Sequence, residues 1–170
     1  MKFKKTELSL EGKVVTATVQ VYEKSDLEKL KDYYWQWVNL SNSLQDFGGR
    51  RINLPEIISE SIFCIHFNSV RLNESISGVN TSFDCYQLDT KKRIQIKACS
   101  IEEDLTSFGP KSVWDELYFV HFFPNHKYDG CFAIYLIKNN LIYDHRVSKT
   151  QTFREQQAQG RRPRFSIIKD

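Results

Sequence analysis

Residues suited to divalent-cation chemistry lie in two neighbouring segments of the chain. Asp84 comes first, and Gln95, Ile96 and Lys97 follow on a second segment. Hard cations such as Mg²⁺ prefer oxygen ligands, which Asp84, Gln95 and the backbone carbonyl of Ile96 can supply. Lys97 could hold or deprotonate a water molecule and stabilise a charged transition state. The combination predicts metal-assisted hydrolysis of a phosphodiester bond.

Strand geometry is expected to bring these side chains together. Side chains alternate along a strand, so Gln95 and Lys97 should share one face while Ile94 and Ile96 face the core. If Asp84 lies on the partner strand of a hairpin, it comes within a few ångströms of Gln95. The alternative is a purely structural hairpin in which Asp84 and Lys97 form a cross-strand ion pair and Gln95 lies on the surface.

Glu60 is a further candidate ligand because of its apolar surroundings. It interrupts a run of mostly apolar residues, and an acid buried there needs a partner, a metal ion or a raised pKa. In the structural alternative, Glu60 is only half-buried. Both interpretations stay open on these residues alone.

Segments with clear patterns precede and include the candidate residues. Residues 13–22 are rich in β-branched side chains and predict a strand. A capping pattern at residues 25–28, followed by apolar residues at helical spacing, predicts a helix that ends at the glycine pair beginning at Gly48. A second helix is expected from Pro55 to about Leu72.

The remaining pattern is mainly that of strands. Residues 82–88 and 93–99 predict a hairpin, and residues 117–123 and 131–137 predict two further strands. A helix near residues 153–159 and a last strand at residues 164–168 complete the chain. This order predicts an α/β (α+β) fold in one domain spanning residues 1–170, with a mixed β-sheet flanked by helices.

Positive charge is concentrated at the C-terminal end. Residues 146–170 hold seven Lys or Arg and two acids, a balance of +5, so the other residues balance to −2 within the total of +3. Such a basic segment is expected where a protein meets nucleic-acid phosphates. A solvated basic tail is the alternative.

Cysteine usage and hydropathy point to a cytoplasmic protein. The cysteines are dispersed in apolar segments without a Cys-x-x-Cys pair, which predicts buried free thiols at Cys64, Cys85, Cys99 and Cys131. The first residues are charged, and no apolar run reaches the length of a membrane span. We expect neither a signal peptide nor a membrane partner.

Several longer motifs resemble a known family. They are Val19-Gln20-Val21-Tyr22, Tyr33-Tyr34-Trp35-Gln36-Trp37-Val38, Gly48-Gly49-Arg50-Arg51 with Asn53 and Pro55, Ser59-Glu60, Ile94-Gln95-Ile96-Lys97, Thr106-Ser107-Phe108-Gly109-Pro110 with Ser112, Trp114 and Asp115, and Gln159-Gly160-Arg161-Arg162-Pro163-Arg164-Phe165-Ser166-Ile167. Together they resemble the Bsp-six-I group of Type II restriction endonucleases across nearly the whole chain.

The resemblance implies a PD-(D/E)XK core, Mg²⁺ dependence with Mn²⁺ as a substitute, and cleavage of double-stranded DNA at an interrupted palindrome of the form GCNGC. Glu60 matches the helix acid, Asp84 the first metal ligand, Gln95 the acid position of the strand motif, and Lys97 its lysine. Gln95 departs from the Asp or Glu usual in the broader superfamily. A neutral amide oxygen still coordinates Mg²⁺ but removes one negative charge, which weakens the case for two metals.

The resemblance also implies partners and a DNA-contacting surface. A palindrome read by so small a protein calls for a homodimer, and a restriction enzyme requires a cognate methyltransferase. Arginine and lysine read guanine best, in the major groove. The candidates for base or phosphate contacts are Lys111, Ser112, Trp114, Arg161, Arg162 and Arg164, with Arg50 and Arg51 as further backbone contacts.

Two other functions fit the same residues. A structure-specific or repair nuclease on the same core would prefer branched or damaged DNA to a defined sequence. A DNA-binding module with an inactive site is suggested by the neutral Gln95. Cleavage of a linear sequence would separate the leading hypothesis from both.

Overall fold

A seven-stranded mixed β-sheet forms the centre of the protein. The computed structural model describes residues 1–72, 74–101 and 105–167. The strand order is β1-β2-β3-β4-β5-β7-β8, and every neighbouring pair is antiparallel except the parallel pair β5 and β7. The bounds are β1 Lys2–Leu10, β2 Lys13–Val21, β3 Ser69–Leu72, β4 Cys85–Gln87, β5 Lys92–Cys99, β7 Glu116–His121 and β8 Ala133–Ile137.

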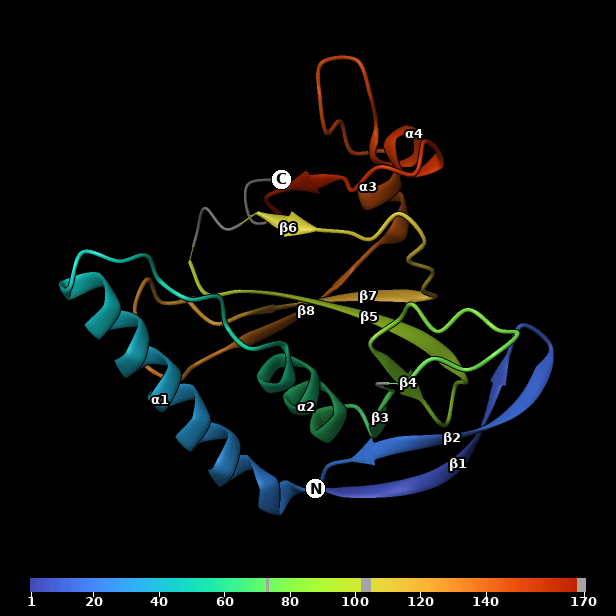
Figure 1. Cartoon of the computed structure of the whole chain (residues 1–170), viewed down its shortest axis with the longest axis horizontal. Coiled ribbons are helices and arrows are strands. Elements are labelled where there is room, and N and C mark those ends of the chain that lie inside the picture. Colours follow the sequence, from blue (N-terminus) through green and yellow to red (C-terminus); the bar gives the residue numbers. More distant parts are fainter. Residues whose placement is uncertain (73, 102–104, 168–170) are drawn as a thin grey trace.

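Helices and a small second sheet cover the two faces of the central sheet. On one face lie α1 (Leu27–Asp46), which follows the short 3-10 helix η1 (Lys24–Asp26), and α2 (Glu56–His66) (Figure 1). The other face carries α3 (Asn139–Tyr143), α4 (Phe153–Ala158) and a two-stranded sheet of β6 (Thr106–Ser107) and β9 (Arg164–Phe165). The predicted α+β architecture with a mixed sheet flanked by helices is confirmed.

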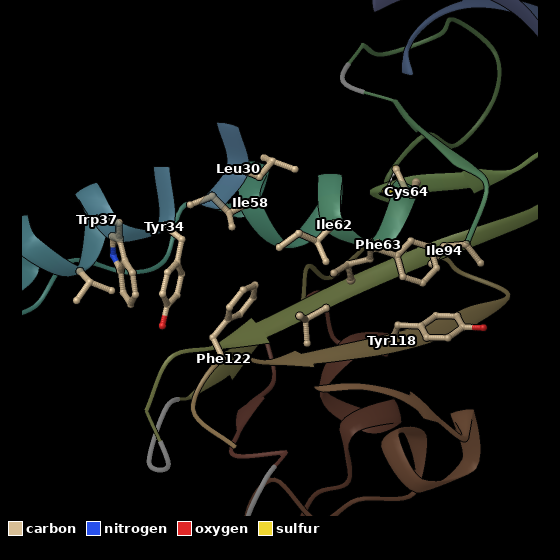
Figure 2. Close-up of a cluster of buried hydrophobic side chains, with 14 residues drawn as sticks. Leu30, Tyr34, Trp37, Ile58, Ile62, Phe63, Cys64, Ile94, Tyr118 and Phe122 are labelled. Atoms are coloured by element: carbon tan, nitrogen blue, oxygen red, sulfur yellow. Dashed lines mark hydrogen bonds between the residues drawn. The ribbon is translucent and has the colours of Figure 1, made fainter. Parts of the chain in front are cut away.

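The larger core lies between the two long helices and the sheet. Figure 2 shows side chains of α1 and α2 meeting those of β5 and β7 in one cluster, which includes Tyr34, Trp37, Phe63, Ile94 and Tyr118. On α1 the buried positions recur three or four residues apart, so one stripe of the helix faces the core. This packing fixes α2, the helix that carries Glu60, against β5.

The predicted start and end of α1 are close to the observed ones. The capping box is formed by Glu23 and Asp26 around η1, and not by the serine of residues 25–28. At the other end, Gly48 adopts a left-handed φ of 88°, and the N–H of Gly49 donates to the Leu44 carbonyl at 2.7 Å. This glycine termination of the helix is the one predicted from the sequence.

The predicted second helix is too long. It was expected to reach Leu72, but α2 ends at His66 and residues 69–72 form β3. The break falls at Asn68, whose φ of 48° is left-handed and incompatible with a continuing helix. A short apolar run suits a buried strand as well as a buried helix, and here it pairs with both β2 and β4.

The strands expected at residues 13–22, 117–123 and 131–137 correspond to β2, β7 and β8, and the helix expected near residues 153–159 corresponds to α4. The expected last strand contains β9, and its final residue, 168, lies outside the described residues. The sequence did not predict β1, β6 or α3. The first six residues of β1 are largely exposed, so they carry little apolar alternation.

Three of the four cysteines are buried free thiols, as predicted, but Cys131 is exposed. It lies just before β8, an edge strand of the central sheet whose residues are themselves exposed or half-buried. No helix in the described part of the chain is long and apolar enough to cross a membrane.

Candidate catalytic cavity

A cavity of about 280 Å³ lies where α2, β5 and β6 approach one another. Its lining combines acids, a lysine and small polar side chains, and includes Glu56, Glu60, Asp84, Lys97 and Ser107. The backbone before α2 and the segment before β6 complete the walls. Four of the predicted site residues, Glu60, Asp84, Ile96 and Lys97, therefore line one space.

Asp84 and the strand β5 are joined as the hairpin prediction required. The antiparallel pairing of β4 with β5 places Cys85 opposite Ile94, and the N–H of Asp84 donates to the Ile94 carbonyl at 3.0 Å. The Oδ2 atom of Asp84 accepts a short hydrogen bond from Gln95 Nε2 and another, 2.7 Å long, from the Ile96 N–H.

The expected alternation along β5 is also observed. Ile94 and Ile96 belong to the core cluster under α2. Lys97 lies on the opposite face, where its Nζ is 5.4 Å from the centre of the Phe108 ring. Because Asp84 accepts from Gln95 and Ile96, and no ion pair joins it to Lys97 within the described residues, the structural alternative of a cross-strand ion pair is not observed.

The carbonyl of Ile96 faces the same side as its N–H. In a strand, both polar groups of one residue point to the same neighbouring strand. The Ile96 N–H points to Asp84, and Ile96 lines the cavity. The carbonyl can therefore face the cavity as a backbone ligand.

Glu60 is buried and paired, and is not the half-exposed residue of the structural alternative. Its side chain is 7% exposed and forms an ion pair with Arg71 of β3. The guanidinium of Arg71 also donates to Gln20 Oε1 at 2.9 Å and lies 3.6 Å from a carboxylate oxygen of Glu56. The expectation that a buried acid needs a partner is thus met by an arginine.

The two cavity carboxyls, Glu60 and Asp84, both have raised pKa values. Burial and the neighbouring Asp84 raise the pKa of Glu60 and Arg71 opposes the rise, with a net result of about 8. Burial also raises the pKa of Asp84, against the lowering influence of Lys97 and the Ile96 N–H. Two like charges in one buried space favour the protonated form of at least one of the two carboxyls.

The donor set fits a small, hard cation. Glu60, Asp84, Gln95 and the Ile96 carbonyl offer only oxygen ligands, which Mg²⁺ prefers. The Oε1 atom of Gln95 is buried and has no hydrogen-bond donor among the described residues, an arrangement that suits an ion or a water molecule. No group of three or more acidic, histidine or cysteine side chains suited to a metal occurs in the described chain, so Gln95 and the carbonyl must complete any such site.

The basic C-terminal segment reaches the rim of this cavity. Arg164 on β9 pairs with Ser107 on β6, which lines the cavity. Arg162 and Arg164 are exposed, and the exposed Arg161 donates to Gln151 Oε1 at 2.8 Å. The last residues of the segment, 168–170, lie outside the described residues.

The loop before β7 contains one expected contact residue that is buried. Lys111 is exposed and Ser112 is half-buried. Trp114 is only 4% exposed, stacks on Tyr143, and donates through Nε1 to Asn139 at 2.9 Å. The indole packs in the cluster that includes residues of α3 and α4, so its burial argues against direct access to DNA, and the expected DNA contact of Trp114 stays a prediction.

The two arginines before α2, Arg50 and Arg51, differ in their exposure and contacts. Arg50 is exposed. Arg51 is half-buried, donates to Asn42 at 2.8 Å, and lies 4.4 Å from the centre of the Tyr128 ring. Arg50 remains available for a phosphate, whereas Arg51 fastens the loop to the protein.

Sequence reasoning missed Arg71 and did not assign Ser107 or Glu56 a place in the cavity. Arg71 lies in the stretch predicted as helix, where a single basic residue gives no signal. Its ion pair with Glu60 depends on the turn at Asn68, which returns the chain along α2 as β3. To find this ion pair from the sequence, residues 69–72 would have had to be predicted as a strand.

Comparisons with known proteins agree on one family. The family model of the Bsp6I (Bsp-six-I) restriction endonuclease matches residues 22–170. The Type II restriction enzyme Bsp6I of Bacillus sp. (strain RFL6) is 36% identical over 152 residues, which cover 86% of this chain and 81% of that enzyme. No solved structure matches the chain. The expected family and enzyme class are confirmed: the chain belongs to the Bsp6I family of restriction endonucleases.

Proposed function

We propose that the cavity between α2, β5 and β6 is the catalytic centre of a Mg²⁺-dependent Type II restriction endonuclease that cleaves double-stranded DNA at GCNGC. The observation that carries the proposal is the convergence of Glu60, Asp84 and Lys97 on one cavity, with Gln95 bonded to Asp84. The recognition sequence comes from the family resemblance.

Asp84, Gln95, Glu60 and the Ile96 carbonyl would hold the cation. Mg²⁺, or Mn²⁺ with similar oxygen ligands, would withdraw negative charge from the scissile phosphate. Gln95 contributes an oxygen without a charge, so the two carboxylates supply all of the negative charge among the ligands. We propose one cation, because Arg71 and Lys97 already offset these two charges.

Lys97 would act on water at the open side of the cavity. Its ammonium can orient a water molecule and offset the charge that develops on the phosphate oxygens; as a neutral amine, after releasing a proton to solvent, it can accept the proton of the attacking water. The water oxygen then bonds to phosphorus as the bond from phosphorus to the leaving oxygen breaks. Phe108 packs below the ammonium and restricts its position.

Exposed basic residues around the cavity would hold the duplex. Arg162 and Arg164 lie on the segment that pairs with the cavity rim, and Arg50 lies in the loop that leads into α2. Most protein–DNA hydrogen bonds go to the backbone, so we assign these residues and Arg161 mainly to phosphates. Lys111 and Ser112 are proposed contacts in the loop before β7.

A second copy of the chain would complete the enzyme. A palindrome has two equivalent halves, so a two-fold dimer can read both and place one cavity on each strand. A cognate methyltransferase would protect the host DNA.

An apolar groove on α1 supports this dimer. It is lined by Tyr33, Leu40, Pro55 and Ile57, among others, while Glu56 of the same segment lines the cavity. Tyr33, Leu40 and the 94% exposed Phe47 are spaced by seven residues, so they follow one stripe. An antiparallel copy centred on Leu40 would place each Phe47 against the other copy's Tyr33.

The substitution Lys97→Ala tests the catalytic assignment. The variant should lose plasmid cleavage by at least about a hundredfold, since general acid–base groups contribute about 10²–10⁴-fold. Binding of a GCNGC duplex should remain, because Lys97 lies inside the cavity. Cleavage and gel-shift binding are measured side by side with Mg²⁺ and with EDTA.

Three outcomes would contradict the proposal. Unchanged cleavage by Lys97→Ala would remove this lysine from the mechanism. Preference for branched over linear DNA would favour a structure-specific or repair nuclease. Binding without cleavage by the unaltered protein, in both Mg²⁺ and Mn²⁺, would favour a DNA-binding module with an inactive site.

A further inference from the structure

Arg71 connects three elements behind the cavity. It projects from β3, and its side chain is 13% exposed. Its Nε atom pairs with Glu60 Oε2 of α2, Nη1 donates to Gln20 Oε1 of β2 at 2.9 Å, and Nη2 lies 3.6 Å from Glu56 Oε1. Each nitrogen of the guanidinium thus has a different acceptor.

The network leaves one oxygen of Glu60 for the cavity. Arg71 engages Oε2, and within the described residues no donor is bonded to Oε1. Glu60 lines the cavity, whereas Arg71 is not part of the lining. The arginine therefore holds the carboxylate from behind without occupying the space in front of it.

The acceptor Gln20 is itself held in place. Its Oε1 atom also accepts from the Tyr22 hydroxyl at 3.0 Å, and Gln20 is buried in the sheet beside β3. By contrast, Glu56 is 81% exposed and adds a weaker, solvent-screened attraction. The orientation of Arg71 is set mainly by Glu60 and by the buried amide of β2.

We infer that Arg71 is a positioning residue for the cation of this enzyme, acting through Glu60. This inference rests on the proposed function of the cavity. Glu60 and Asp84 repel each other when both are ionised, and the guanidinium offsets that repulsion while fixing which oxygen faces the cavity. A lysine would keep the charge but could not bond to Glu60 and Gln20 in the same planar geometry.

Cation affinity tests the inference without relying on cleavage. Calorimetric titration of Mn²⁺ into the full-length protein would compare the unaltered chain with Arg71→Lys. Loss of a partner that orients a metal ligand typically weakens metal binding by about 10–100-fold, and we expect a loss in that range for Arg71→Lys. Thermal unfolding of the metal-free variant verifies that it folds.

Arg93→Lys is a matched control. Arg93 also forms a forked ion pair in the sheet, with Asp115 at 2.7 and 3.0 Å, and it does not line the cavity. Its replacement should leave Mn²⁺ affinity within about twofold of the unaltered protein, as expected for sites without shared partners. An equal loss in both variants would mean that general weakening of the sheet explains the effect, and would overturn the inference.

A double substitution separates action through Glu60 from other roles. Glu60→Gln removes the charge that Arg71 orients, so adding Arg71→Lys to Glu60→Gln should change Mn²⁺ affinity little further. A full additional loss would show that Arg71 acts independently of Glu60 and would overturn the inference.

The same titrations distinguish this inference from the proposed function. If the unaltered protein binds Mn²⁺ and Asp84→Asn abolishes that binding, the cation site stands. Unchanged affinity in Arg71→Lys then contradicts only the role of Arg71. If Asp84→Asn binds Mn²⁺ as tightly as the unaltered protein, the proposed cation site itself is wrong.

Discussion

At the residue scale, each of the two buried carboxyls of the cavity interacts with a positively charged side chain. Glu60 faces Arg71 through an ion pair, and the charge of Lys97 acts on Asp84. Isolated charges are costly to bury, so each carboxylate requires such a partner or a proton. Among the described residues, the buried amide oxygen of Gln95 has no hydrogen-bond donor, which is a second energetic cost beside Asp84. A bound cation would offset the carboxylate charges and would give the Gln95 oxygen a partner.

Cation binding should therefore depend on pH. The folded protein raises the pKa of Glu60 from 4.5 to about 8, and a cation must displace the proton held there. Mg²⁺ affinity should rise with pH, by up to about tenfold per unit for one released proton, and level off above about pH 8. Titrations at several pH values, in buffers of different ionisation enthalpy, measure the affinity and the protons released.

In the absence of metal, the stability of the folded protein should fall as the pH rises. Because the native state binds this proton more tightly than the unfolded state, the associated stability is present below about pH 4.5 and is lost as pH rises towards about 8. Mg²⁺ should thus stabilise the protein more at pH 8.5 than at pH 5.5 in thermal unfolding. Equal stabilisation at both pH values would contradict the pKa assignment.

Much of the residue-scale arrangement follows from the sequence. The hairpin prediction placed Asp84 beside Gln95, and strand alternation placed Lys97 on the face opposite Ile96. Arg71 could not be predicted in the same way. Its contact with Glu60 arises from a chain reversal at Asn68, which an apolar run does not reveal.

At the element scale, short segments position the cavity rim. The two-residue strands β6 and β9 pair with each other, and a cluster of aromatic side chains packs around them. Phe108, Trp114, Phe153 and Phe165 form this cluster, which joins the loop before β7 to the C-terminal segment. The placement of the basic tail beside the cavity therefore depends on aromatic packing.

Trp114→Ala should destabilise the protein substantially. The indole is buried and bonded to Asn139, and replacing a buried tryptophan by alanine costs about 3–5 kcal/mol. Urea unfolding measures this loss. Trp114→Phe keeps most of the packing and should keep DNA affinity; a stable Trp114→Phe variant that no longer binds DNA would restore the indole as a DNA contact.

Elements with regular apolar patterns were predicted well, whereas the largely exposed β1 and the short β6 and α3 were missed. The apolar stripe and terminal glycines defined α1, a β-branched run defined β2, and short runs of apolar and aromatic residues indicated β7 and β8. The strands β6 and β9 have two residues each, and α3 has five. Elements of this length are set by tertiary contacts, so local propensity does not identify their limits.

At the scale of the whole molecule, the sheet has one charged edge, and the helix α1 exposes several apolar side chains. Lys2 and Lys4 on β1 discourage edge-to-edge pairing of that strand. Tyr33 and Leu40 on α1, and Phe47 just after its end, are by contrast exposed apolar or aromatic side chains. Association through α1 is thus favoured over extension of the sheet at β1.

Phe47→Glu should shift a dimer towards monomer. The substitution places a charge on each side of the proposed two-fold contact, whereas Val14→Glu changes a similarly exposed apolar residue on β2, away from the groove. Sedimentation equilibrium should show at least a tenfold weaker association for Phe47→Glu, since an unpaired charge at an interface costs about 1.4 kcal/mol or more. Equal association of the two variants would place the dimer contact elsewhere.

The central claim is that the Asp84 cavity cuts DNA at a defined palindrome. Its most direct test is digestion of one mapped plasmid with Mg²⁺, followed by run-off sequencing of the ends, with Asp84→Asn as the inactive control. We predict discrete fragments whose ends all lie at GCNGC sites, and no fragments with EDTA or with Asp84→Asn. Ends scattered over unrelated sequences, or the same fragments from Asp84→Asn, would contradict the account.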